Sequence, residues 1–435
     1  MVTSTTAASL RFLSSLLEDY PARDIAVRAW DGQVWQPAAP PSLTIVLRHP
    51  AAARRMFSPP KMLTLCEAYL YGDIDLEGDV ETFWSLVEHL FVSGAAKGRL
   101  TRKAVERGLA GVPEGGPERA GRQAPKMAGE FSSLARDREA IASHYDVSND
   151  FYALWLDKRM VYSCAYFATG DETIEQAQEQ KLEHICRKLR LKPGDRLLDV
   201  GCGWGGLIRH AAERYGVEAT GITISAAQAE GARERIQKAG LASRCKVELC
   251  DYRQLQGEGR FDKVVSVGMF EHVPEGMLPT YFAQAWKLLK PGGVFLNHAI
   301  SLHVGPVMPI GTQFVYLYIF PDSQLQAVSA TLNVAEKAGF EVRDVECLRE
   351  HYELTTRHWL RRLEEREAEA KAVTSELTYR VYRLYLAMSA RSFRIGQPSI
   401  HQSLLSKPLD GRSGLPLTRA DWYAPRPALR ISDAA

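Results

Sequence analysis

The chain has 435 residues, of which 46% are hydrophobic, 24% charged and 9% aromatic, enough to bury sizeable cores in two or three domains. This composition excludes a chain disordered throughout, a collagen-like repeat and a disulfide mini-protein. The 54 Lys and Arg residues against 52 Asp and Glu residues leave a formal net charge of +2, so overall charge points to no partner, and we expect none that is a nucleic acid.

The seven cysteines are odd in number, scattered and free of CxxC pairs. Most of them are expected to be buried thiols in a reducing compartment, and no metal site is expected. No run of about 18 or more apolar residues occurs that could span a bilayer. The first twenty residues lack a basic leader followed by a sustained apolar stretch, which favours a short amphipathic helix over a signal peptide.

Residues 1–107 are predicted to form a small α+β domain that associates with lipid or a membrane. Residues 42–47 are typical of a strand, and a helix follows them. A later amphipathic helix carries an apolar stripe at helical spacing, formed by Phe83, Leu86, Val87, Leu90 and Phe91. The stripe is interpreted as core rather than as a lipid groove, and no chemical constellation is found in this unit.

Residues 108–130 are predicted to be a flexible linker, because residues 108–125 hold eight Gly or Pro in eighteen positions. The wider stretch 97–126 carries eight basic residues against three acidic ones. Two interpretations stay open: a solvated hinge, or a basic strap that binds anionic lipid head groups. The basic residues are Lys97, Arg99, Arg102, Lys103, Arg107, Arg119, Arg122 and Lys126.

Residues 131–425 show strand-like apolar runs that alternate with helical stretches, which predicts an open, mostly parallel sheet covered on both faces. Ligands of such sheets bind beyond the carboxyl ends of the strands. Residues 355–395 interrupt the alternation with two long helices, one highly charged and one rich in Tyr and Arg. Residues 426–435 are predicted to be a tail.

The strongest local signal is the sequence LLDVGCGWGG at residues 197–206, where an apolar strand runs into a helix. Gly201 and Gly203 lack a Cβ, so a ligand can approach the backbone, and the helix N-terminus offers free N–H donors. The spacing differs from the G-x-G-x-x-G dinucleotide pattern, and no phosphate-binding Lys is present. This favours a nucleoside ligand without a pyrophosphate.

Two later strand ends support that interpretation. Asp251 ends the third strand, where its carboxylate could accept from an adenine amino group, and residues 266–273 (SVGMFEHV) end the fourth. With residues 290–293 (KPGG), these motifs resemble the S-adenosylmethionine-dependent methyltransferases over about residues 180–350. The resemblance implies a Rossmann-like seven-stranded α/β fold with inserted C-terminal helices. It implies cofactor contacts from Tyr162, Ser163, Gly201, Gly203, Thr223, Ser225, Gln228, Asp251, Tyr252 and Gly268.

Many such enzymes place an acid after the second strand to hold the ribose, whereas this strand ends in Thr223, Ser225 and Gln228, which can form those hydrogen bonds without charge. This block is similar to that of the cyclopropane fatty acid synthases. Residues 144–152 (HYDVSNDFY), 160–167 (MVYSCAYF) and 318–321 (YIFP) carry the same resemblance, which covers about residues 135–425.

The resemblance implies transfer of a methylene group from S-adenosylmethionine to a cis double bond of phospholipid acyl chains. It implies a cytoplasmic enzyme held peripherally at the inner face of the membrane, and a possible homodimer. In the family, a bound bicarbonate serves as the base, and the matching positions here are Cys164, Glu271, His298, Ile300 and Tyr352. Singly, Cys164, His298 and Tyr352 could equally be packing residues, but all five residue types are retained together.

One mismatch concerns Ser389, which stands where family members commonly carry a cysteine long regarded as catalytic. A hydroxyl ionises far less readily than a thiol, so either that cysteine is dispensable, which we favour, or the reaction is altered. Residues 322–324 (DSQ) also replace a commonly Gly-rich segment, so the acyl entrance is expected to differ.

Three alternatives follow for function. The same methyl transfer could end in a methylene fatty acid, the precursor of a methyl-branched chain. The protein could instead bind lipid without turnover, or methylate a soluble nitrogen or oxygen nucleophile, which fits the Cys/Glu/His/Tyr set poorly. For membrane contact, the candidates are the basic linker, the N-terminal unit and four arginines for which internal salt bridges are the alternative: Arg380, Arg383, Arg391 and Arg394.

Overall fold

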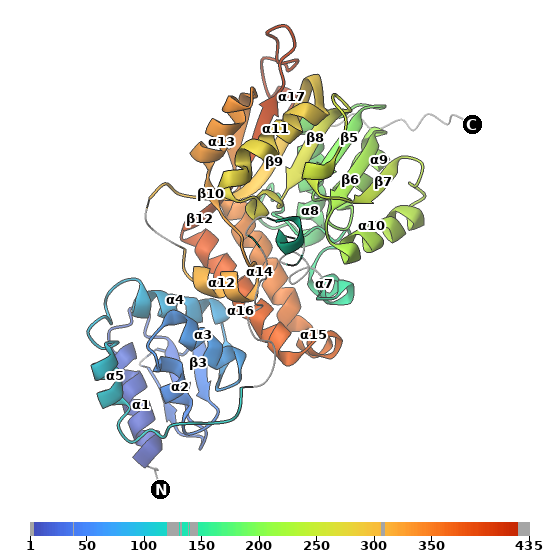
Figure 1. The fold of residues 1–435 in the computed structure, drawn as a ribbon. Helices are drawn as coiled ribbons and strands as arrows, with labels where there is room; N and C mark the ends of the chain where they lie inside the picture. Colours follow the sequence, from blue (N-terminus) through green and yellow to red (C-terminus); the bar gives the residue numbers. More distant parts are fainter. Residues whose placement is uncertain are drawn as a thin grey trace. The chain divides into compact units, whose positions relative to one another are not determined.

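The structure is a computed structural model that describes residues 4–37, 39–119, 130, 133–137, 139, 147–305 and 309–424. The chain divides into two compact units, each assembled from three segments (Figure 1). The first unit comprises residues 1–155, 303–323 and 352–399. The second comprises residues 156–302, 324–351 and 400–435. These boundaries differ from the predicted domain boundaries, because two later segments are packed into the first unit.

The second unit contains a sheet with the strand order β11-β12-β9-β8-β5-β6-β7, and a two-residue strand, β10, pairs with β9. Strands β7, β6, β5, β8 and β9 are parallel neighbours, whereas β11 is antiparallel to β12. The strands are β5 (Arg196–Val200), β6 (Glu218–Thr223), β7 (Cys245–Leu249), β8 (Phe261–Val267), β9 (Leu289–Leu302), β10 (Gln326–Ala327), β11 (Glu341–Cys347) and β12 (Pro398–Ser406). The predicted seven-stranded α/β fold is confirmed.

Helices cover both faces of this sheet. Successive residues of a strand point to opposite faces, so neighbouring residues pack against different helices. Leu197 packs into a core shared with residues of α8, α9 and α10, whereas the next residue, Leu198, packs into a core shared with α11 and α13. The helices of this unit are α8 (Ile174–Leu189), α9 (Gly206–Tyr215), α10 (Ala226–Lys238), α11 (Leu278–Leu288), α13 (Val328–Lys337) and α17 (Ala420–Tyr423), with short η1 (Tyr252–Gln254), η2 (Phe270–His272) and η3 (Glu275–Met277).

The first unit has a four-stranded sheet in the order β2-β1-β3-β4, in which β1 and β3 are parallel. Its strands are β1 (Ile25–Arg28), β2 (Val34–Trp35), β3 (Leu43–Leu47) and β4 (Ile74–Gly78). Its helices are α1 (Ser4–Leu17), α2 (Ala52–Phe57), α3 (Met62–Leu70), α4 (Val80–Phe91), α5 (Arg102–Gly108), α7 (Asn149–Trp155), α12 (Thr312–Tyr318), α14 (Arg349–Glu365) from residue 352 onward, α15 (Glu367–Val373) and α16 (Glu376–Arg394).

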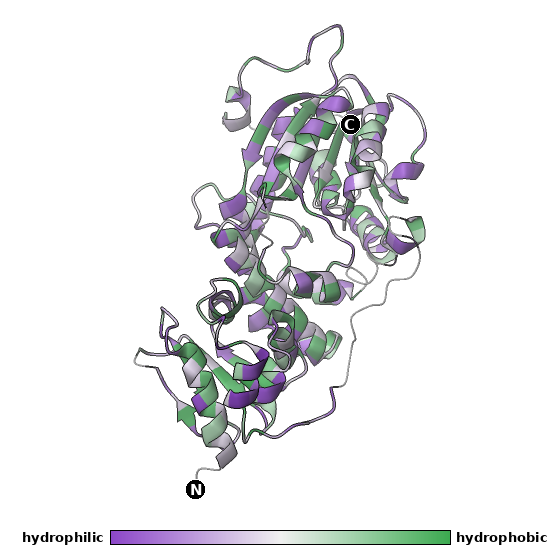
Figure 2. Ribbon diagram, turned by 60° about the vertical axis from the view of Figure 1, so that its left-hand side comes forward, coloured by the Kyte–Doolittle hydropathy of each residue, from purple (hydrophilic) through white to green (hydrophobic). Residues whose placement is uncertain are grey.

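The apolar stripe of α4 is core, as interpreted from the sequence. Phe83, Leu86, Val87 and Leu90 are buried, and hydrophobic and hydrophilic residues alternate along the helices of this unit (Figure 2). The buried Trp84 on the same helix donates its indole N–H to the carbonyl of Leu384 on α16, at 2.9 Å. The first unit therefore has one interior to which the N-terminal residues and the late helices both contribute.

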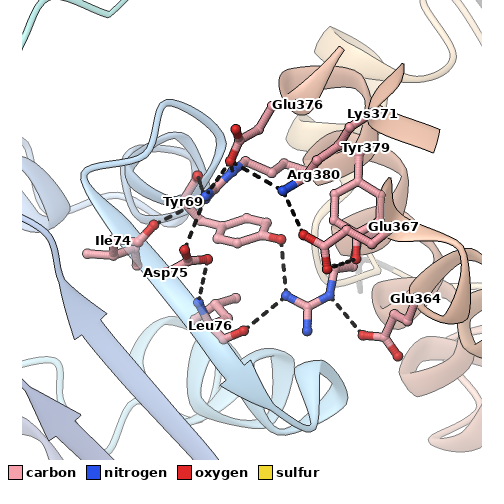
Figure 3. Close-up of polar contacts among 11 residues, drawn as sticks. Tyr69, Ile74, Asp75, Leu76, Glu364, Glu367, Lys371, Glu376, Tyr379 and Arg380 are labelled. Carbon is pink, nitrogen blue, oxygen red and sulfur yellow. Dashed lines mark hydrogen bonds and ion pairs between the residues drawn. The ribbon is translucent and has the colours of Figure 1, made fainter. Parts of the chain in front are cut away.

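Two arginines of α16 bind the N-terminal part of the first unit. Arg380 donates to the carbonyl oxygens of Tyr69 and Ile74 and pairs with Asp75 and Glu376, contacts that are drawn in Figure 3. Arg383 donates to the hydroxyl of Tyr69, to the Leu76 carbonyl and to Glu364. We call Arg380 and Arg383 with these partners the arginine clasp.

The predicted linker is packed over its first half. Leu109 and Val112 are buried, and Arg54 donates to the carbonyl oxygens of both residues. Arg119 forms an ion pair with the buried Asp73, at 2.7 Å. Residues 108–119 are thus packed within the first unit and do not form the flexible linker that was predicted. Two of their apolar side chains are buried, although the segment is rich in Gly and Pro. Residues 120–129, which include Arg122 and Lys126, lie outside the described residues. The predicted tail at 426–435 also lies outside them.

Candidate active site

The Gly-rich turn after β5 is fixed by backbone hydrogen bonds. The N–H groups of Gly201 and Cys202 both donate to the carbonyl of Ile222 on β6, at 2.9 Å. Both Gly201 and Gly203 have positive φ, and a Cβ at Gly201 would lie 2.6 Å from the Cβ of Met269. A Cβ at Gly203 would have no protein atom within 4 Å. Gly201 is therefore required for packing, whereas Gly203 leaves open space for a ligand at the strand end.

Helix α8 holds the segment that contains Tyr162 and Ser163. The buried Gln178 donates to the carbonyl oxygens of Val161 and Ser163, and the Lys181 ammonium donates to the Ser163 hydroxyl, at 2.8 Å. Burial lowers the pKa of Lys181 to about 8, although nearby carboxylates oppose this shift. The segment is thus fixed from one helix by two buried polar side chains that the sequence analysis did not single out.

Asp199 is buried at the end of β5, directly before the Gly-rich turn. Burial raises its pKa to about 7, and the charge of Lys181 opposes this rise. Neither Asp199 nor Lys181 was predicted as a site residue. The LLDVG pattern could have indicated Asp199, but the contact of Lys181 with Ser163 depends on the tertiary position of α8.

The polar residues that end β6 bind one another and the start of α10. The Thr223 hydroxyl donates to the Gln228 side-chain oxygen at 2.8 Å, and the Gln228 backbone N–H donates to the Ser225 hydroxyl at 3.2 Å. Ser225 is therefore the N-cap of α10. Their predicted contact with a ribose stays a prediction, and these hydrogen bonds already orient the three side chains.

Asp251 follows β7 and forms a close pair with Arg253. One carboxylate oxygen accepts from the Arg253 backbone and Nε, at 2.9 and 2.8 Å, and the other accepts from Nη2 at 2.7 Å. The neighbouring Tyr252 packs edge-on against Tyr281, with ring centroids 5.5 Å apart. An adenine amino group would share the Asp251 carboxylate with Arg253, a partner that the sequence did not predict.

Glu271 lies in η2, just after β8, and is buried. Its Oε1 accepts the backbone N–H of Ile300 on β9, at 2.8 Å, so the structure brings these two predicted residues into direct contact. Its Oε2 is buried and has no hydrogen-bond partner among the described residues. Burial raises the pKa of Glu271 to about 7, although the Ile300 hydrogen bond opposes the rise.

His298 lies two residues before Ile300 on β9 and is fully buried. Its Nδ1 accepts from the side-chain amide of Gln402 on β12, at 3.2 Å, which places the ring proton on Nε2. That Nε2 is buried without a partner in the described part of the chain. Burial lowers the pKa of His298 well below its usual value, so the ring is neutral. Gly268 donates its backbone N–H to the carbonyl of His298, at 2.9 Å.

Cys164 and Tyr352 lie in different units. Cys164 is buried in the second unit, and its thiol contacts the carbonyl oxygens of Ala165 at 3.3 Å and Leu348 at 3.7 Å. Tyr352 belongs to the first unit, where its ring packs against Phe393 with centroids 4.5 Å apart. Four of the five predicted catalytic residues therefore share one unit, and Glu271 and Ile300 are in direct contact.

Ser389 is buried on α16 in the first unit. The first residues of the 144–152 motif, up to residue 146, lie outside the described residues. Within the described residues, no group of three or more His, Cys, Asp or Glu side chains could hold a metal ion. None of the helices described is long and apolar enough to cross a membrane.

Comparison with known proteins gives two family matches. A family model described as mycolic acid cyclopropane synthetase matches residues 132–403, and one described only as a domain of unknown function matches residues 12–92. A probable fatty acid methyltransferase from Pseudomonas putida is 40% identical over 403 residues, which are 92% of this chain and 96% of the relative. The cyclopropane-fatty-acyl-phospholipid synthase of Escherichia coli K12 is 38% identical over 281 residues, which are 63% of this chain and 69% of the relative.

Solved structures agree with the sequence relatives. The cyclopropane synthase MmaA2 from Mycobacterium tuberculosis superimposes with a TM-score of 0.59 at 34% identity, covering 62% of this chain and 97% of its own. A mycolic acid cyclopropane synthase complexed with SAH and CTAB gives a TM-score of 0.58 at 33% identity, with the same coverage. Coclaurine N-methyltransferase, at 19% identity and a TM-score of 0.54, shares the fold alone. The chain therefore belongs to the cyclopropane synthetase family and is an enzyme with the methyltransferase fold.

Proposed function

We propose that the protein transfers a methylene group from S-adenosylmethionine to the cis double bond of unsaturated acyl chains in membrane phospholipids. The residues at the ends of β5 to β8 fit such a cofactor, because Gly203 leaves space beside the backbone and Thr223, Ser225 and Gln228 supply uncharged polar groups. When bound, S-adenosylmethionine supplies a sulfonium-activated methyl group, which a weakly nucleophilic alkene needs.

The observation that carries the proposal is a pair of buried polar atoms without partners among the described residues, Glu271 Oε2 and His298 Nε2. Buried polar groups are nearly always hydrogen-bonded, so an unpaired acid and an unpaired imidazole N–H are typical of a site that receives a small polar ligand. With a pKa of about 7, Glu271 can carry a proton, and His298 is a neutral donor. The two groups therefore suit an anion that both accepts and donates hydrogen bonds, as bicarbonate does.

We assign Cys164, Glu271, His298 and Tyr352 to holding bicarbonate, which would supply the base. Methyl transfer to the alkene leaves a carbocation on the acyl chain, and a proton must leave the new methyl group before the ring closes. Burial of Glu271 and His298 excludes water, which would otherwise capture the cation. The Ile300 N–H is already used by Glu271, so its role is to orient that carboxyl group.

Peripheral attachment to anionic membranes is part of the proposal, because no described helix spans a bilayer and the Escherichia coli relative is named for a phospholipid substrate. The four arginines of α16 are weak candidates for lipid contact, since each pairs with an acid within the first unit. Lys97, Lys103 and Arg107 are exposed and form no ion pair with any described residue. They are the basic groups we assign to lipid contact.

The test is incubation of the protein with methyl-labelled S-adenosylmethionine and vesicles that contain a cis-unsaturated phospholipid, followed by mass spectrometry and NMR of the lipid. We expect labelled cyclopropane protons. Labelled exocyclic methylene protons would instead assign the methylene product. Label-free lipid together with cofactor binding would contradict the proposal and favour a lipid-binding protein without turnover.

A further inference from the structure

Two segments of the second unit are joined by side-chain to backbone hydrogen bonds. The Cys164 thiol contacts the Leu348 carbonyl at 3.7 Å, and the Phe167 backbone N–H donates to His351 Nδ1 at 3.0 Å. The first segment carries Cys164, and the second is the start of α14, where Tyr352 is the next residue after His351. The chain between these segments spans about 180 residues, so their alignment depends on these contacts rather than on chain connectivity.

Ring stacking fixes the plane of the His351 imidazole. The Tyr166 ring lies 4.8 Å from the His351 ring with an interplanar angle of 17°, and 4.5 Å from the His184 ring at 29°. His184 is held in turn by Glu346 on β11, at 2.8 Å. Because the stacked Tyr166 ring restricts its rotation, His351 is held with Nδ1 towards the Phe167 N–H, so little further side-chain entropy is lost when that hydrogen bond forms.

We propose that His351 is a positioning residue which, by accepting the Phe167 N–H, holds the segment that carries Cys164 against the first residues of α14 within the second unit. The inference rests on the proposed function, because it assigns Cys164 to the reaction. Nδ1 must be an unprotonated acceptor, so the ring is neutral with its proton on Nε2.

Protonation of Nδ1 would remove this acceptor. The groups that influence the ring are Glu346, Glu350, His184 and Glu172. Burial lowers the pKa of His351, and His184 acts in the same direction, whereas the three carboxylates oppose the shift. The acceptor is consequently retained at and above neutral pH.

Two substitutions separate the hydrogen bond from the ring. His351→Asn places Oδ1 close to the position of Nδ1 and keeps an acceptor, whereas His351→Phe keeps an aromatic ring against Tyr166 and removes the acceptor. We expect His351→Phe to lower kcat by about 30-fold or more with KM within about threefold, because misplacement by about 1 Å can cost about a hundredfold. His351→Asn should stay within about fivefold of the wild-type kcat.

Hydrogen exchange gives a readout that does not require turnover. The Phe167 amide should exchange at least tenfold faster in His351→Phe than in the wild type and His351→Asn, while the melting temperatures of the two variants stay similar. Equal losses of kcat in both variants, or unchanged Phe167 exchange in His351→Phe, would overturn the inference. If wild-type protein transfers no methyl group, the proposed function fails, and the exchange comparison still decides whether His351 holds Phe167.

Discussion

At the scale of single residues, the candidate site is distinguished by two buried carboxyl groups whose pKa values are raised above the ordinary range. Burial raises the pKa of both Glu271 and Asp199 to about 7. In each case the native state binds a proton more tightly than the unfolded chain, whose carboxyl groups titrate near 4.5 and 3.8. Stability contributed by these groups is therefore present below about pH 4 and is lost as pH rises towards 7, opposite to an ordinary salt-bridged carboxylate.

Glu271→Gln should abolish the loss of stability that Glu271 causes as pH rises towards 7, and it also removes the acidic group. The amide oxygen can still accept the Ile300 N–H, so we expect turnover to fall by orders of magnitude with cofactor affinity nearly unchanged. In thermal or urea unfolding, the variant should gain stability relative to the wild type between pH 5 and 8, by at most about 3 kcal/mol. Parallel losses of turnover and of cofactor binding would mean that Glu271 is misassigned.

Ser389→Ala should be nearly silent in turnover, because the hydroxyl of Ser389, which is buried on α16, ionises far less readily than the thiol that family members commonly carry. Labelled-lipid kinetics of the wild type, Ser389→Ala and Ser389→Cys would check this. A tenfold or larger loss in the alanine variant, recovered by cysteine, would revive a chemical role for this position.

The residue types of the site were predictable, but their partners were not. Motif matching placed Glu271, His298 and Cys164 from the sequence alone, and the structure puts all three in the second unit. Gln402, which binds His298, escaped notice because it lies on a strand that was not predicted. Lys181 was missed for a related reason, since a buried lysine on a helix has no sequence signature until its tertiary neighbours are known.

At the scale of elements, the alternation of apolar runs predicted most of the large sheet. Strands β5 to β8 end at or next to the motifs that the sequence placed at strand ends, namely residues 197–206, Thr223, Asp251 and residues 266–273. Strand β12 was missed because its sequence, PSIHQSLLS, mixes polar residues with apolar ones, although it is buried along nearly its whole length. One buried polar group of this strand, the side-chain N–H of Gln402, is satisfied by His298 Nδ1 on β9.

The arginine clasp predicts a large difference between two arginines of one helix. Arg383→Met should destabilise the protein by about 3–5 kcal/mol, because it leaves Glu364, the Tyr69 hydroxyl and the Leu76 carbonyl without their buried donor. Arg394→Met is the matched control, since Arg394 is more exposed and its pair with Glu81 should contribute at most about 1 kcal/mol. Urea unfolding of both variants measures this, and equal effects would contradict the assigned role of the clasp.

At the scale of the whole molecule, a net charge of +2 conceals where cations are available for a partner. Many arginines that looked free in the sequence are paired internally, including Arg99 with Asp19 and Arg119 with Asp73. Lys97, Lys103 and Arg107 remain exposed near α5. The sequence could locate this basic stretch but could not show which of its charges were already used.

Vesicle co-sedimentation tests the membrane proposal. Binding to vesicles with anionic lipid should weaken as salt rises, and substitution of Lys97, Lys103 and Arg107 by Gln should weaken it by about 1 kcal/mol per charge at low salt. Substitution of Lys192, Lys238 and Lys246 in the second unit provides a charge-matched control. Binding that does not depend on salt or on anionic lipid would contradict electrostatic attachment through α5. Binding that falls equally in both triple variants would contradict it as well.

The scattered make-up of the first unit has a consequence for synthesis. Arg383 and its acceptor, the Leu76 carbonyl, are 307 residues apart in the sequence. Trp84 and its acceptor, the Leu384 carbonyl, are 300 residues apart. While the ribosome is still translating the intervening chain, the partners of Trp84 and Tyr69 on α16 do not yet exist. The N-terminal part of the first unit therefore cannot complete its buried contacts until α16 has been synthesised. The N-terminal domain is thus finished late, and a nascent chain stalled before α16 should be a better substrate for proteases and chaperones than the completed protein.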